Sequence, residues 1–114
     1  MTDRGELDVR RERAARNEIL FREVNERIES ASEGASLNEF VCECADKACS
    51  QRVSLTPEEY EQVRSRPEWF VVSPGHNAPG VDLIELASDR YFIVSKLGSG
   101  AQVAREHDPR SQTD

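Results

Sequence analysis

Three cysteines lie close together in the segment Cys42-Glu43-Cys44-Ala45-Asp46-Lys47-Ala48-Cys49. An odd number of cysteines, in a chain that does not open with a secretory leader, argues against a disulfide framework. Thiols at this spacing are typical of metal ligands, because a tight turn after Cys-x-Cys brings a third sulfur to the same ion. The segment therefore predicts a zinc knuckle in which Cys42, Cys44 and Cys49 bind Zn²⁺. A metal-free cluster of semi-buried thiols, and an iron–sulfur or other metal site, are the alternatives.

A fourth ligand must come from elsewhere, since structural zinc usually has four protein ligands. The chain has two histidines. His107 lies in a polar segment near the C-terminus, whereas His76 follows a Pro-Gly pair whose restricted and free dihedrals can direct the imidazole. We predict that His76 completes a Cys₃His site. Asp46, Glu43 and water are the competing ligands, and a histidine that only hydrogen-bonds the turn is the simpler interpretation.

This ligand set argues against catalysis. Four protein ligands close the coordination shell, so no position is left for a water that zinc could activate. Three thiolates also weaken the ion as a Lewis acid. The zinc deaminase pattern and a glycine-rich phosphate loop after a strand are both absent from the sequence. We therefore expect that the protein is not an enzyme.

The charge and hydropathy of the chain exclude other classes of function. A formal net charge of −7 argues against a general affinity for nucleic acid or for an anionic membrane. The residues around the cysteines are themselves acidic, namely Glu39, Glu43 and Asp46. No apolar run approaches the ~20 residues that cross a bilayer. We expect a cytoplasmic protein for which nucleic acid is not a favoured partner.

The elements that position the site follow from the hydrophobic patterns. A capping box with proline at the first helical position, Thr56-Pro57-Glu58-Glu59, predicts a helix over residues 57–65. Apolar segments predict strands over residues 37–42, 52–55, 69–72, 81–86 and 91–97, the last two forming a hairpin. With an amphipathic helix over residues 9–32, this order predicts an α+β fold with a small antiparallel sheet.

The N-terminal helix has one stripe of apolar and small residues at helical spacing. The stripe consists of Ala14, Asn17, Phe21, Val24, Ile28 and Ala31. Glu18 and Arg22 stand at the favourable i,i+4 spacing and order of a helical ion pair. The stripe either covers the small core or forms a contact surface for a partner helix, including that of a homodimer.

Large apolar residues concentrate in the middle of the chain. This distribution predicts an amphipathic helical arm over residues 1–36, a zinc-binding α+β core over residues 37–97 and a disordered tail over residues 98–114.

Several of these motifs resemble a family of small uncharacterised proteins of high-GC Gram-positive bacteria. The resemblance spans roughly residues 10–97. It is carried mainly by Phe40-Val41-Cys42-Glu43-Cys44, Cys49 and Pro74-Gly75-His76. It implies a domain that spans most of the chain and a Cys–His site, and it implies no reaction.

The combined observations predict a non-enzymatic zinc-binding protein that acts through protein–protein contacts, in a regulatory role. The predicted contact surface is the N-terminal helix, with an unknown protein partner or a second copy of the chain. A thiol-based redox sensor that releases zinc on oxidation is one alternative. A small nucleic-acid-binding zinc module is another.

Overall fold

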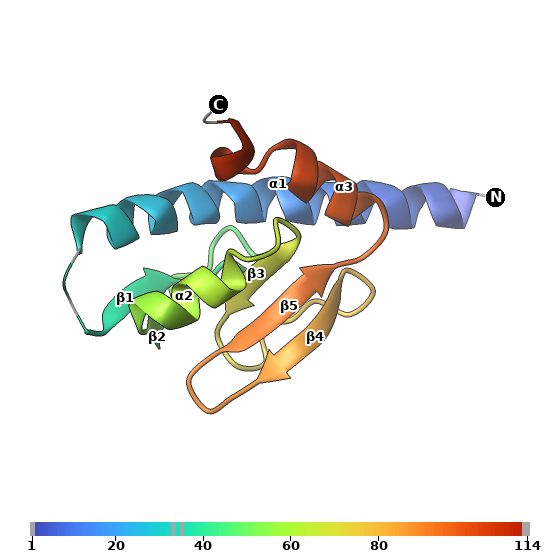
Figure 1. The fold of residues 1–114 in the computed structure, drawn as a ribbon. Helices are drawn as coiled ribbons and strands as arrows, with labels where there is room; N and C mark the ends of the chain where they lie inside the picture. Colours follow the sequence, from blue (N-terminus) through green and yellow to red (C-terminus); the bar gives the residue numbers. More distant parts are fainter. Residues whose placement is uncertain (1, 33, 35, 113–114) are drawn as a thin grey trace.

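The computed structural model describes residues 2–32, 34 and 36–112. A long helix, α1 (Thr2–Ala31), crosses the whole molecule (Figure 1). It is followed by β1 (Asn38–Val41), β2 (Arg52–Leu55), α2 (Pro57–Val63), β3 (Trp69–Val72), β4 (Asp82–Ala87) and β5 (Phe92–Lys96). The chain ends with α3 (Ser99–Glu106) and a 3₁₀ turn, η1 (Pro109–Gln112). The predicted α+β class is confirmed.

The strands form two small antiparallel sheets. β1 pairs with β2, and β5 lies between β3 and β4 in the second sheet. The predicted hairpin of the last two strands is therefore confirmed. The two sheets meet where the backbone N–H of Glu43 donates to the carbonyl oxygen of Val71, at 2.8 Å. The segment after β1 thus lies between both sheets, which matters for the site.

The α2 helix begins as its sequence predicts. The N–H of Glu59 donates to the Thr56 hydroxyl at 3.1 Å, and the N–H of Thr56 donates to the Glu59 carboxylate at 2.8 Å. This reciprocal capping box satisfies two backbone donors of the first turn. Tyr60 and Val63 are buried on the inner side of the helix. The helix ends two residues earlier than predicted, at Val63.

The prediction of a disordered tail is wrong for residues 99–112. Ser99–Glu106 forms α3, which packs against α1 and buries Val103 and Ala104. η1 is fixed on the same helix, because Arg110 pairs with Glu26 at 2.8 Å. The glycines and polar residues of this segment gave no sign of these long-range contacts. Residues 113–114 of the predicted tail lie outside the described residues, and the boundaries at 36 and 97 stay a prediction.

Of the two interpretations of the α1 stripe, the one in which it covers the core is wrong in part, since Val24 and Ala31 are exposed. Leu20 and Val24 are 62% and 42% exposed, whereas Glu18, Arg22 and Asn25 are fully buried. Ala15 and Ile19 accompany these polar residues on the buried face. The predicted pairing of Glu18 with Arg22 does not form, since Glu18 pairs with Lys96 and Arg22 donates to the carbonyl oxygen of Pro67. The inner face of α1 therefore includes polar residues with partners in distant segments, and a pattern of apolar residues does not detect such partners.

Candidate metal centre

The three cysteines lie in the loop between β1 and β2. Cys42 follows β1 directly, and its N–H donates to the carbonyl oxygen of Gln51 at 3.0 Å, which extends the pairing of the two strands by one step. A tight turn then brings the chain back, since the N–H of Cys49 donates to the carbonyl oxygen of Asp46 at 2.9 Å. The Asp46 carboxylate accepts the N–H of Ala48 at 2.9 Å and so holds this turn from within. The loop folds the three thiols toward one point.

His76 approaches the same point from a turn after β3. The N–H of His76 donates to the carbonyl oxygen of Ser73 at 2.9 Å, which closes a four-residue turn through Pro74 and Gly75. Gly75 has a φ of 83°, a value that side chains disfavour and glycine adopts readily. The Pro-Gly pair therefore produces the turn that the sequence indicates. It directs the imidazole back toward the cysteines.

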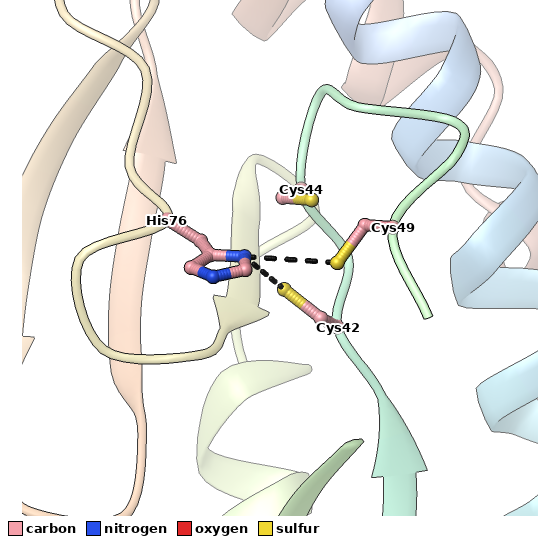
Figure 2. Close-up of side chains that lie close together, drawn as sticks. All are labelled: Cys42, Cys44, Cys49 and His76. Atoms are coloured by element: carbon pink, nitrogen blue, oxygen red, sulfur yellow. Dashed lines mark hydrogen bonds between the residues drawn. The ribbon is translucent and has the colours of Figure 1, made fainter. Parts of the chain in front are cut away.

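The structure brings all four predicted residues together. Their ligand atoms all lie within 4.8 Å of one another, and these residues are Cys42, Cys44, Cys49 and His76. The Nδ1 atom of His76 lies 3.6 Å from the Sγ atoms of both Cys42 and Cys49, as Figure 2 shows. A tetrahedral zinc with ordinary Zn–S and Zn–N bonds separates sulfur and nitrogen by roughly 3.6 Å. This Cys₃His cluster could hold a metal ion.

The other candidate ligands have different roles. Glu43 is fully buried, and its carboxylate accepts the N–H of Val71 at 3.0 Å and the side-chain amide of Asn25 at 2.7 Å. Asp46 uses its carboxylate within the turn described above. His107 is exposed and forms the C-cap of α3. Glu43, Asp46 and His107 are therefore not part of the Cys₃His cluster in the described part of the chain.

The thiols are unequally accessible. Cys42 and Cys44 are buried, and Cys49 is partly exposed. Burial raises the pKa of both the Cys42 and the Cys44 thiol, because the charged thiolate loses hydration. Three thiolates so close together also repel one another. A bound cation would remove both costs, so the site favours thiolates only when it holds a metal ion.

Backbone donors are already directed at two of the sulfurs. The N–H of Ser73 points to the Cys42 sulfur at 3.1 Å, and the N–H of Gln51 points to the Cys49 sulfur at 3.5 Å. Such N–H···S contacts stabilise negative charge on sulfur and orient the ligand. Ser73 also begins the turn that carries His76. One short segment thus supplies both a ligand and a donor to another ligand.

Sequence reasoning missed the polar residues that support the loop from α1. The side chain of Asn25 pairs with Val41 in both directions, accepting its N–H at 2.8 Å and donating to its carbonyl oxygen at 2.9 Å. The Arg22 guanidinium lies 3.7 Å from the centre of the Phe70 ring. Burial raises the pKa of Glu43, and the Arg22 charge opposes that rise. An asparagine inside a helix is a weak signal of such a role, since asparagine is a poor helix former.

Comparisons with known proteins do not identify the chain: no family model, no curated protein and no solved structure matches it. The family resemblance therefore stays a prediction. Among the described residues, no helix is both long enough and apolar enough to cross a membrane.

Proposed function

We propose that the protein is a zinc-binding protein in which Cys42, Cys44, Cys49 and His76 hold one Zn²⁺ in a closed, structural site. The observation that carries this proposal is the separation of 3.6 Å from the His76 Nδ1 atom to each of two sulfurs, which equals the edge of a tetrahedral zinc site. The thiolate-rich ligand set favours zinc over magnesium or calcium, which prefer oxygen ligands. With four protein ligands, the ion has no open position for a substrate.

The role of such an ion is to fold the loop after β1 against the turn after β3. Zinc contributes on the order of 10 kcal/mol to the folding of small metal-dependent peptides, which is comparable with the whole stability of an ordinary domain. We propose that the protein acts through contacts with another protein, with α1 as the contact surface, and not as an enzyme. The exposed Leu20 and Val24 side chains support a contact on the outer side of this helix.

The first experiment measures metal content. Protein purified without chelator should contain one zinc per chain, and removal of zinc should lower its melting temperature. Cobalt in the same site should give the strong thiolate-to-cobalt bands of a tetrahedral sulfur site. Protein that contains no metal and takes up neither zinc nor cobalt would sink the proposal.

The second experiment tests the fourth ligand. We expect His76→Ala to change the ligand-field bands of the cobalt form and to weaken zinc binding by 10-fold or more, as loss of a direct ligand should. His107→Ala is the matched control, because His107 is exposed and far along the chain from the cluster. Unchanged cobalt bands in His76→Ala would mean that another group completes the shell.

A redox-sensing role is a second candidate, favoured by the partial exposure of Cys49 beside two buried thiols. Mild peroxide should then release zinc, and a reductant should restore binding. Full zinc retention at millimolar peroxide would remove this candidate.

A further inference from the structure

The apolar core consists of two clusters, and α1 contributes buried residues to one of them. The first cluster contains Ala15 and Ile19 of α1 together with Cys42 and Cys44, and Cys49 packs against it. The second cluster joins β1, β2, α2, β3 and β5 and contains no cysteine. Among the described residues of α1, only the partly buried Ile28 packs against it. The metal loop and α1 thus share one part of the core.

Polar contacts between α1 and the metal loop are specific. Asn25 pairs with both backbone groups of Val41, the residue before the first cysteine. Its side-chain amide also donates to Glu43, the residue between two of the cysteines, at 2.7 Å. Because Glu43 lies between two proposed ligands, its position depends directly on the conformation that the metal imposes on the loop.

The inner face of α1 has little apolar surface with which to dock by itself. Glu18, Arg22 and Asn25 are all fully buried there, beside two alanines and Ile19. Buried polar groups are stabilising only while their partners are in place, and each one becomes costly when its partner moves. Glu18 pairs with Lys96 and Arg22 donates to the carbonyl oxygen of Pro67, whereas the partners of Asn25 are Val41 and Glu43. The docking of α1 around Asn25 therefore depends on the exact placement of the metal loop.

The geometry points to a metal-controlled contact: zinc in the Cys₃His cluster holds the part of α1 around Asn25 against the sheets through Glu43, and loss of zinc releases this part of the helix. This inference rests on the proposed zinc site. Without the ion, the three thiols and the imidazole are no longer held at one point, and Glu43 leaves its position beneath Asn25. The second cluster retains its own packing. The metal would thereby decide whether the inner face of α1 is covered or available.

Hydrogen exchange of the full chain tests whether loss of zinc releases this part of α1. We expect amides of α1 around Asn25 to exchange at least 10-fold faster after zinc is removed with a chelator, and to regain protection when zinc is added back. Amides of β4 and β5 should stay protected in both forms, because these two strands pair with each other without the metal loop. Equal protection of α1 in both forms would overturn the inference, and so would a simultaneous loss of protection in every element.

Metal affinity gives a second test, because coupling is reciprocal. If metal-free protein has a released α1, a variant that weakens docking must weaken zinc binding by the same factor. We expect Asn25→Ala to weaken zinc binding on the order of 10-fold, although Asn25 is not a ligand. Arg27→Ala is the control, since Arg27 lies on the exposed side of the same helix and should leave the affinity unchanged.

The two proposals fail in different ways. A chain that binds no zinc overturns the proposed function and this inference together. If the chain binds zinc, two results overturn this inference alone. One is an unchanged zinc affinity of Asn25→Ala, and the other is equal protection of α1 amides with and without zinc.

Discussion

Lys96→Met removes the cation that pairs with two buried carboxyl groups. The ammonium group of Lys96 pairs with the carboxylates of both Glu18 and Asp82, and all three side chains are completely inaccessible to solvent. Asp82 also accepts the N–H of Ala78 at 2.8 Å. Burial raises the pKa of Glu18 to about 8, so near neutral pH this carboxyl holds a proton and Lys96 balances the charge of Asp82. Methionine fills a similar volume without the charge.

The expected loss follows from the burial of the pair. Removal of one partner from a buried ion pair costs about 3–5 kcal/mol, because the other charge is left without compensation. A domain of this size has a total stability of roughly 5–15 kcal/mol, so the variant should lose a large part of it. The corresponding fall in melting temperature is roughly 10–20 °C.

Urea unfolding, followed by circular dichroism at pH 5.5 and pH 8 with saturating zinc, measures this loss. In wild type the Lys96 charge opposes part of the rise that burial gives the pKa of Glu18. In the variant this pKa rises further, so the folded chain holds a Glu18 proton that the unfolded chain releases. The difference in unfolding free energy between wild type and variant should therefore be smaller at pH 5.5 than at pH 8. A loss below about 1 kcal/mol, or a loss that does not grow with pH, would refute the reasoning about this cluster.

Three further substitutions test other parts of the fold. The pKa of Glu18 is about 8 in the folded protein and ordinary in the unfolded chain, so wild type loses stability as the pH rises from 4.5 through 8. Glu18→Gln should therefore become more stable relative to wild type over that range. A constant difference between their urea midpoints would contradict this. Gly100→Ala should lower the free energy of unfolding by about 1–3 kcal/mol although alanine is the better helix former, because the added Cβ would lie 2.9 Å from the backbone oxygen of Arg11. Gly5→Ala is the control in thermal unfolding, since its added Cβ meets nothing within 4 Å. Thr56→Ala should cost about 1 kcal/mol through loss of the capping box, and an unchanged melting temperature would argue against that cap.

Local sequence signals were sufficient for most of the elements. The capping box at Thr56 and the polar loop between the last two strands depend on residues that are adjacent in the chain. The sequence alone therefore predicts both α2 and the hairpin of β4 and β5. The turn that carries His76 is a similar case, because Pro-Gly has few conformations other than the one observed. The candidate ligands were predictable for the same reason, since three cysteines in a short segment have few uses inside a small chain.

The face of α1 was not predictable from the same kind of signal. Its spacing of apolar residues is compatible with a stripe that covers the core and includes Val24, yet Val24 is exposed and Arg22 is buried. Arg22 is buried because a backbone carbonyl, an aromatic ring and Glu43 surround it, and all three come from distant segments. The α3 helix was missed for a related reason, because its short apolar face acquires a partner only when α1 lies beside it.

By itself, the sequence determined the fold class, the strand-rich middle segment and the four residues that could bind a metal, because each depends on residues near one another in the chain or on a rare side chain. The tertiary structure alone decided that these four side chains meet, that Glu43 faces α1, and that α1 docks through polar side chains. These outcomes depend on distances between segments far apart in the chain, and buried polar pairs are stable only when both partners are placed.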